Sequence, residues 1–271
     1  MMTRQRYRIV HATDLSAESW LAFLHALRLA LALEGELTIL HVAERGQRGH
    51  APAVREALEQ WGMIAPGTSR EHVEAETGLR VGKAEIRDHD PVQGVAHFLD
   101  RHGCDMLVLA THARDGLGHM LKGSIAEAIA NAIAVPTLFV PIGRSGFVEP
   151  RSGALLLRRI VMPVAAETSA RHALHEIEDL AKALGLAPDV IDLVHVGHEV
   201  LRLTDREGTR GRPVRHLPEG PIVAAILDAS NEADLIVMPT HGHDSMIDSL
   251  RGSTTERVMR QAPCPVLSIP S

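Results

Sequence analysis

The chain has 271 residues, of which 45% are apolar and 23% are charged, and its formal net charge is −6. This length suggests about two domains of average size, and the composition is typical of a globular protein. Lysine and arginine are spread along the chain, which argues against a nucleic-acid surface, and no apolar run approaches the length of a membrane-spanning helix.

The first half of the chain alternates short apolar runs with helical patterns. Strands are predicted at 7–13, 37–43, 77–86, 105–111 and 137–142. Helices are predicted at 16–34, 50–61, 91–102 and 124–134. Ser16 is placed to cap the first helix, Gly35 to end it, and Pro91 opens the third helix.

The second half repeats this order. Strands are predicted at 158–164, 190–196, near 212–216, 234–239 and 265–269. Helices are predicted at 167–184, 219–231 and 253–262. Residues 144–153 are rich in Gly, Ser, Arg and Pro and predict a linker, so we expect one domain over 1–143 and a second over 154–271.

The two halves are also alike residue by residue. At a shift of 129 positions, residues 104–141 are identical to the second half at 12 of 38 positions, where chance gives about two or three. Among these pairs, Asp105 falls on Asp234. At larger shifts near the start of each half, Ile9 falls on Ile160 and His41 on His195. The chain is therefore predicted to be an internal duplication.

Apolar strands that alternate with helices predict a parallel sheet covered on both faces. The fold class is then α/β and doubly wound, and such sheets bind ligands at the carboxyl ends of their strands. In each half, "LATHARDGLGHMLKGS" (109–124) and "MPTHGHDSMIDSLRGS" (238–253), the fourth strand leads through a loop to a Gly-Ser pair that opens a helix. Such a helix start can bind phosphate through its backbone N–H groups. Ser124 and Ser253 could equally be N-caps without a ligand.

The stretches "IVHATDLS", "LTILHV", "DMLVLATH" and "TTERVMRQAPCPVLSIP" resemble the universal stress protein family, once in each half and over nearly the whole chain. The resemblance implies two tandem Rossmann-like domains of the adenine-nucleotide alpha hydrolase type. Each would have a five-stranded parallel-type sheet with helices on both faces, and the two would pack as an internal pseudo-dimer. It also implies a cytoplasmic stress-response regulator or sensor rather than an enzyme, and two such chains could pair further.

Some members of that family bind ATP through Gly-x2-Gly-x9-Gly-Ser/Thr and an Asp after the first strand. The first half keeps the Asp and the final Gly-Ser pair but has Ala110 and Ala113 for the leading glycines. The second half keeps the second glycine and the Gly-Ser pair, but Pro239 replaces the first glycine and Ala165 the Asp. The resemblance therefore implies ATP, with magnesium, bound in one half by some of these residues: Thr13, Asp14, Val42, Gly123, Ser124, Gly242, Gly252, Ser253 and Thr254.

If only one half binds, the second is favoured for phosphate contact because Gly242 is kept there, although Asp14 argues for the first. Lys122 and Arg251 precede the Gly-Ser pairs and either meet phosphates or are solvated. The alternative function is a nucleotide-independent scaffold that binds an unknown protein partner. Residues 45–78, the longer middle of the first half, would either cover its site as a lid or lie apart from it.

Other chemistries are less well supported. The 17 histidines include His41, His112, His241 and His243, but no third ligand has the spacing to close a metal site. A hydrolase built on Ser253 lacks the Gly-x-Ser-x-Gly elbow, and no P-loop motif is present. The two cysteines, Cys104 and Cys264, give no disulfide framework and favour a reducing compartment. Asp14 and His11 interrupt the first apolar run, so no secretory leader is expected.

Overall fold

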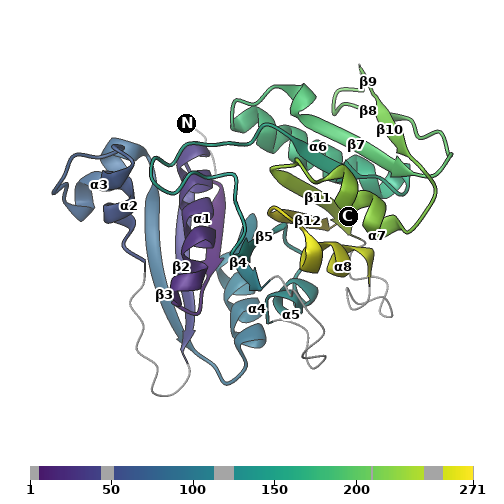
Figure 1. Ribbon diagram of the computed structural model, residues 1–271. Helices are drawn as coiled ribbons and strands as arrows, with labels where there is room; N and C mark the ends of the chain where they lie inside the picture. Colours follow the sequence, from purple (N-terminus) through teal and green to yellow (C-terminus); the bar gives the residue numbers. More distant parts are fainter. Residues whose placement is uncertain (1–5, 44–51, 113–124, 209, 241–252, 271) are drawn as a thin grey trace.

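The computed structural model describes residues 6–43, 52–112, 125–208, 210–240 and 253–270 (Figure 1). In the first half the strands are β1 (Arg8–Ala12), β2 (Glu36–Ala43), β3 (Arg80–Arg87), β4 (Met106–His112) and β5 (Thr137–Ile142). The helices are η1 (Ala17–Ser19), α1 (Trp20–Ala32), α2 (Val54–Gln60), α3 (Arg70–Thr77), α4 (Pro91–His102) and α5 (Ile125–Ala132).

The second half has the same order of elements with a different middle. Its strands are β6 (Ile160–Pro163), β7 (Ile191–Val196), β8 (Leu203–Thr204), β9 (Gly211–Arg212), β10 (Val214–Leu217), β11 (Leu235–Thr240) and β12 (Val266–Pro270). Its helices are α6 (Glu167–Ala183), η2 (Pro188–Val190), α7 (Ile222–Ala229) and α8 (Thr254–Gln261).

Ten strands form one continuous sheet in the order β10-β7-β6-β11-β12-β5-β4-β1-β2-β3, and β8 and β9 form a separate ribbon. Five neighbouring strands run parallel in each half. The two sets meet where β5 pairs antiparallel with β12, with Phe139 opposite Val266. This confirms the predicted fold class, including the internal pseudo-dimer.

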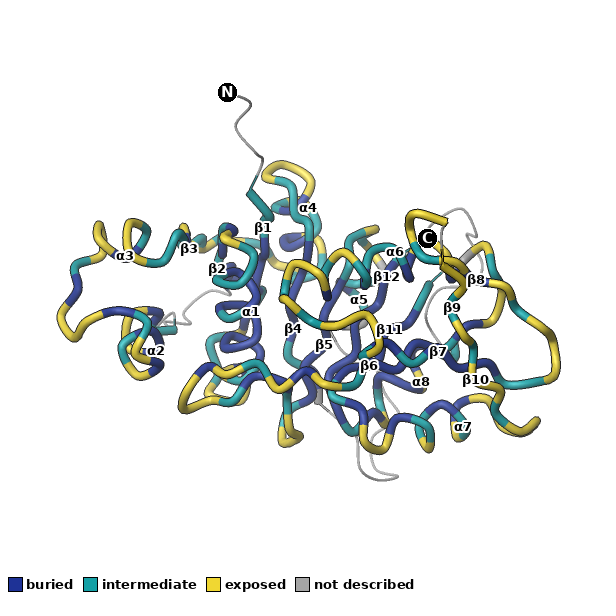
Figure 2. Tube along the Cα trace, turned by 90° about the horizontal axis from the view of Figure 1, so that it is seen from above, coloured by how far each residue is buried: buried dark blue, intermediate teal, exposed yellow. Residues whose placement is uncertain are grey.

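Helices cover both faces of the sheet, and the buried apolar side chains form one cluster on each face. On one face α1 and α6 pack against the strands. On the other face α4 and α5 of the first half and α7 and α8 of the second half do so. Figure 2 shows burial concentrated along the central strands and α1, whereas α3 and the loops around β8 to β10 are largely exposed.

Local sequence explains the best-predicted helix. α4 begins at the expected Pro91, after Asp90, whose side chain accepts a hydrogen bond from the Val92 N–H at 2.9 Å. It ends before Gly103, which has a φ of 71°. An N-cap Asp, a first-turn Pro and a C-terminal Gly together define both ends, so the predicted range 91–102 matches.

The elements that the sequence did not predict lack an apolar repeat. α3 has the sequence "REHVEAET", in which only Val73 is buried, so its helical period is hidden by charge. The ribbon strands β8 and β9 have two residues each. The strand expected near 212–216 is divided into β9 and β10 at Pro213, which has no N–H to donate to a strand ladder.

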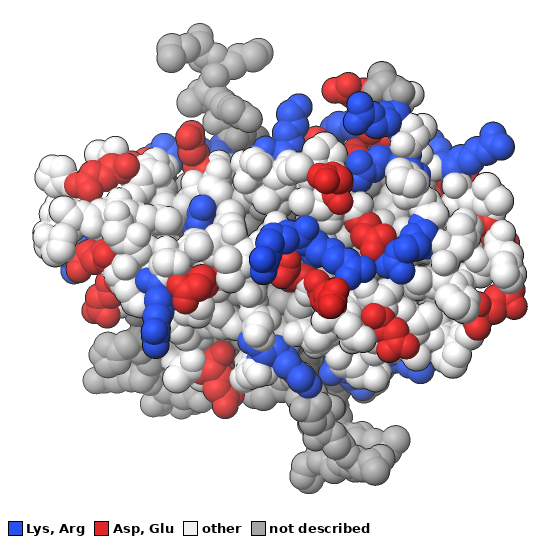
Figure 3. All heavy atoms as spheres, turned by 45° about the horizontal axis from the view of Figure 1, so that its top comes forward, with Lys and Arg blue, Asp and Glu red and all other residues white. Residues whose placement is uncertain are grey.

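The surface carries charges of both signs. Figure 3 shows basic and acidic side chains interspersed over one face. Arg159 and Arg215 both pair with Asp192, at 3.1 and 2.7 Å. Burial raises the pKa of Asp192, but the hydrogen bonds from both arginines outweigh burial and hold the pKa below its usual value. No helix among the described residues is long and apolar enough to span a membrane.

The seam between the halves makes a stability prediction. Phe139 is fully buried beside the antiparallel pairing, so Phe139→Ala is expected to lower the free energy of unfolding by about 3–5 kcal/mol in urea titration. Ile222→Ala is the control, because Ile222 is 53% exposed and its loss is expected to change stability by less than about 0.5 kcal/mol. Equal effects of the two substitutions would contradict the packed seam.

Candidate functional site

The strand order reverses direction beside β1, because β2 lies on one side of it and β4 on the other. In doubly wound sheets ligands bind at the carboxyl ends of the strands at this point. The chain leaves β1 there at Thr13 and Asp14, and the matching point of the second half, after β6, is Val164 and Ala165. The predicted residues Thr13 and Asp14 therefore lie where the fold predicts a ligand.

Thr13 is held by all its polar atoms. Its N–H donates to the Leu40 carbonyl at 2.9 Å, which extends the β1–β2 ladder by one residue. Ser19 Oγ donates to the Ser16 carbonyl, so the Thr13 hydroxyl donates to Ser19 Oγ, at 2.9 Å, and accepts from the Leu15 N–H at 3.0 Å. Thr13 thus anchors the turn by its side chain and is not free to serve as a nucleophile.

Asp14 stands exposed on this turn. Its Oδ1 accepts a hydrogen bond from the Ser16 N–H at 2.9 Å. The next residue, Leu15, has a φ of 62°, a left-handed conformation that costs a non-glycine residue about 1–2 kcal/mol. The Thr13 bonds hold the chain in this conformation, and the bond from the Ser16 N–H orients the carboxylate of the exposed Asp14.

A histidine on the second strand of each half holds the carbonyl at which the first strand ends. His41 Nδ1 donates to the Thr13 carbonyl at 2.9 Å, and His195 Nδ1 donates to the Val164 carbonyl at 2.8 Å. Both histidines are buried. The sequence repeat aligned these two residues but did not show what they do. The structure shows that each one bonds the backbone of the first strand.

The second half lacks the rest of the turn. Ala165 is exposed and has no polar side chain to replace Asp14. The first acidic group beyond it is Glu167, at the start of α6, and its carboxylate accepts the Arg202 N–H at 2.6 Å. This first acidic residue after Ala165 is therefore engaged in holding the loop after β7.

Val42 follows His41 on β2, and its side chain points to the opposite face. Its Cγ1 lies 3.2 Å from the place where a side chain on Gly94 of α4 would begin. Val42 is half-buried, so its contribution to an adenine pocket would come from its backbone, as the resemblance implies.

Ser253 and Thr254 begin α8. Ser253 is the N-cap, and its Oγ accepts the Glu256 N–H at 3.1 Å. Glu256 is buried in the first turn and pairs with Arg260 one turn later. The N-cap interpretation of Ser253 is thus observed, and its hydroxyl proton is still available for an anion.

Four of the predicted site residues, Gly123, Ser124, Gly242 and Gly252, lie outside the described residues. So do Lys122, Arg251, Ala113, His241 and His243. Of the other positions that depart from the family pattern, Ala110 is half-buried on β4. Pro239 on β11 lies beside Ile269 of β12.

His11 is a buried polar residue at this end of the sheet that sequence reasoning did not single out. Its Nδ1 donates to the Val108 carbonyl at 3.1 Å and so links β1 to β4. Burial lowers the pKa of His11 to about 4, although the Val108 carbonyl and the Asp14 charge oppose the change. The imidazole is therefore neutral at pH 7. A histidine inside an apolar strand was the only signal for it in the sequence.

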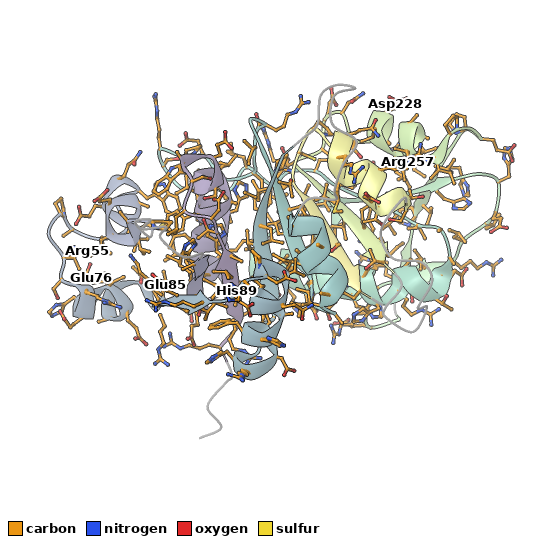
Figure 4. The ribbon with its side chains drawn as sticks, turned by 90° about the horizontal axis from the view of Figure 1, so that it is seen from below. Arg55, Glu76, Glu85, His89, Asp228 and Arg257 are labelled. Carbon is orange, nitrogen blue, oxygen red and sulfur yellow. The ribbon has the colours of Figure 1, made fainter. Side chains whose placement is uncertain are left out.

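Metal-ligating side chains do not gather among the residues that the structure describes at this site. Among the described residues no group of three or more His, Cys, Asp or Glu side chains could hold a metal ion. Figure 4 labels Asp228 on α7 and Arg257 on α8, two helices of the second half that pack against each other. It also labels two residues of the first half: Glu85, which lies on β3, and His89, which follows the end of that strand.

Comparison with known proteins gives consistent matches. A family model described as the universal stress protein family matches residues 6–141 and 198–270. A curated universal stress protein of Methanocaldococcus jannaschii is 27% identical over 139 residues, which cover 49% of this chain and 81% of that protein.

Two solved structures share the whole fold. A universal stress protein from Archaeoglobus fulgidus has a TM-score of 0.63 at 22% identity, over 98% of this chain and 97% of its own. A Pseudomonas aeruginosa protein described as functionally unknown has a TM-score of 0.59 at 14% identity, over 98% of this chain and 92% of its own. These identities show the fold alone.

The cap at α8 yields a prediction that needs no ligand. Ser253→Ala is expected to lower the free energy of unfolding by about 1 kcal/mol, because the Glu256 N–H loses its acceptor. Ser253→Asn keeps an acceptor and is expected to keep most of the stability. Thermal unfolding without nucleotide measures both variants, and an unchanged Ser253→Ala protein would show that the cap contributes nothing.

Proposed function

This chain belongs to the universal stress protein family, and on that premise we propose that it is a stress-response regulator that binds an adenine nucleotide in one of its halves. The observation that carries the proposal is the Asp14 turn. A carboxylate is held exposed at the carboxyl end of β1, beside the point where strand order reverses.

The residues of the first half fit a nucleoside. A carboxylate has several lone pairs that accept hydrogen bonds from ribose hydroxyls, and Asp14 Oδ1 already accepts the Ser16 N–H at 2.9 Å, which orients the group. The backbone of Val42 is at the end of the neighbouring strand β2. In the second half, exposed Ala165 offers nothing to a ribose at the matching position.

The residues of the second half fit a phosphate better than a nucleoside. α8 begins with backbone N–H groups that can meet an anion, and the Ser253 hydroxyl can donate to it. Arg260 pairs with the buried Glu256, so the carboxylate of the first turn is balanced by a positive charge. Magnesium, where it takes part, would arrive with the nucleotide and be held mainly by phosphate oxygens.

We assign a binding role rather than a catalytic one. The side chains at the end of β1 that could do chemistry hold the turn: the Thr13 hydroxyl bonds Ser19 and Leu15, and His41 bonds the Thr13 carbonyl. A sensor needs a ligand to be held and released, and this arrangement provides a rigid surface for that.

Calorimetric titration with ATP and magnesium tests the proposal. Asp14→Ala is expected to weaken binding about tenfold or more, because a hydrogen bond to a charged group is worth roughly 1.5–3 kcal/mol. Asp14→Asn is the matched variant: its side-chain oxygen can keep the Ser16 bond, so its loss of affinity reports the ligand contact and not the turn.

Ala165→Asp tests the same idea by gain. It places a carboxylate at the matching point of the second half and is expected to add a second, separable binding event. Absence of heat with ATP, ADP and AMP at millimolar concentration would refute nucleotide binding and favour the alternative, a scaffold that acts through protein partners.

A further inference from the structure

The segment between the halves is folded, and we call residues 143–159 the strap. It forms a hairpin in which Val148 bridges Leu155 antiparallel and the Leu156 N–H donates to the Phe147 carbonyl at 2.7 Å. Figure 1 shows the strap crossing α1 on its way from β5 to β6. The segment that the sequence predicted to be a linker thus forms a regular hairpin.

The strap is bound to the first half by side chains of α1 and of Trp61, the residue that follows α2. Trp61 Nε1 donates to the Pro150 carbonyl at 2.9 Å, and Arg28 Nε donates to the Gly153 carbonyl at 2.8 Å. The strap side chains that join the core beside α1 are Phe147, Val148 and Leu157.

The strap backbone touches two rings directly. A Cβ on Gly146 would lie 2.1 Å from Cε1 of His25, and one on Gly153 would lie 2.4 Å from Cδ2 of Trp61. Gly153 also has a φ of 68°, which side chains rarely adopt. These two glycines permit close packing against the first half.

Trp61 belongs to a segment in the middle of the first half that is tied together by its own hydrogen bonds, including one from the Trp61 backbone N–H to the Ala57 carbonyl at 2.9 Å. Arg55 on α2 donates to the Thr68 carbonyl at 3.4 Å, and Thr68 Oγ1 lies 3.5 Å from Glu76 on α3. Figure 4 labels Arg55 and Glu76 at this end of the molecule. The described part of the long middle, 52–78, therefore has a structure of its own and meets the strap through Trp61.

His25 on α1 holds the strap by a bond that depends on its protonation state. Its Nδ1 lies 2.7 Å from the Leu21 carbonyl, which can only accept, so Nδ1 carries the proton. Its Nε2 then has the lone pair, and it accepts the Phe147 N–H at 3.0 Å. The Phe147 ring also meets the imidazole edge-on, at 4.5 Å between ring centres.

A second proton on the imidazole would destroy this bond. It would have to sit on Nε2, because Nδ1 already has a proton, and two N–H groups would then face each other across 3.0 Å. Gly146 packs on the ring edge, so the ring has no space on that side in which to turn away. The imidazolium would also be fully buried without an acceptor for its new proton.

We propose that His25 is an acid-sensitive catch for the strap: neutral His25 holds the hairpin on α1, and protonated His25 releases it. Release frees the Phe147 amide and loosens the hairpin over Trp61. The pairing of β5 with β12 remains, so the two halves stay joined while the strap, the second connection between them, becomes less firmly bound to α1.

The pKa of His25 changes in the direction that an acid-sensitive catch requires. Burial lowers the pKa of His25 to about 4 from its usual 6.5, and the Leu21 carbonyl opposes the change. A depressed histidine pKa means that the catch is closed above about pH 6.5 and opens as pH falls toward 4. Charged groups on the elements around the ring are Arg28 on α1, Arg144, Glu149, Arg151, Arg158 and Arg159 on the strap, and Arg55, Glu56 and Glu59 on α2. Leu21 and Phe147 use both ring nitrogens, so no ion pair holds the ring.

Fluorescence of Trp61 tests the proposal in the full chain. The chain has two tryptophans, so Trp20→Phe leaves Trp61 as the sole reporter. As pH is lowered from 8 to 4, its emission is expected to shift to the red before far-UV circular dichroism changes. His25→Gln supplies a carbonyl that accepts the Phe147 N–H at every pH, so this early shift is expected to disappear.

Gly153→Ala in the same background is the matched positive control. It crowds Trp61 and is expected to give the red-shifted emission already at pH 7.5. His11 also titrates in this pH range, so acid unfolding of the whole chain is expected to persist in His25→Gln. A single coincident transition of fluorescence and circular dichroism, or an early shift that survives His25→Gln, would overturn the proposal.

Hydrogen exchange of the unmodified chain decides the matter if the variants fail to fold. Peptides that cover the strap are expected to lose protection near pH 5, after correction for intrinsic rates, while peptides from α4 keep it. Equal protection of the strap at pH 5 and pH 7.5, or equal loss in both regions, would refute the catch.

Discussion

The antiparallel pairing of β5 with β12 makes one molecule of two similar halves. Each five-stranded sheet on its own would leave its last strand as an open edge of unpaired N–H and C=O groups. Pairing Leu138 with Leu267, in a register that places Phe139 beside Val266, covers both edges and makes the sheet continuous. The apolar clusters on its two faces then run through both halves. The strands that lead into the predicted loops, β4 and β11, are the immediate neighbours of this seam.

The two halves share one hydrogen bond at the end of their first strand and differ in the rest of the turn. In both halves a buried histidine, His41 or His195, donates this bond to the carbonyl at which the first strand ends. Only the first half adds the Thr13 bonds and the left-handed Leu15 that present Asp14. Because the backbone bond is common to both, it belongs to the fold. The polar turn is a separate feature, and a rigid fold does not require the unfavourable conformation that it contains.

Sequence reasoning predicted the fold well because hydrophobic periodicity is a local signal. The ends of α4 follow from Asp90 and Gly103 within the same stretch of chain. The sequence places Thr13 and Asp14 at the end of a strand but does not show what holds them there, because His41, which bonds the Thr13 carbonyl, lies 28 positions further along the chain. The structure of the strap was harder to predict. Its glycines indicate a flexible linker, whereas Gly153 is needed so that the backbone can pack against Trp61. Burial of a histidine such as His25 inside a helix is likewise a tertiary fact.

α1 joins the two functional features of the first half. Its approach, η1, contains Ser19, which holds Thr13 and so the Asp14 turn. Two turns further on, His25 and Arg28 hold the strap. The helix is apolar and buried along most of its length, so it is packed tightly between these two points. The residue that holds the Asp14 turn and the residue that holds the strap therefore lie on one continuous stretch of chain, so the proposed nucleotide contact and the proposed catch share one packed support.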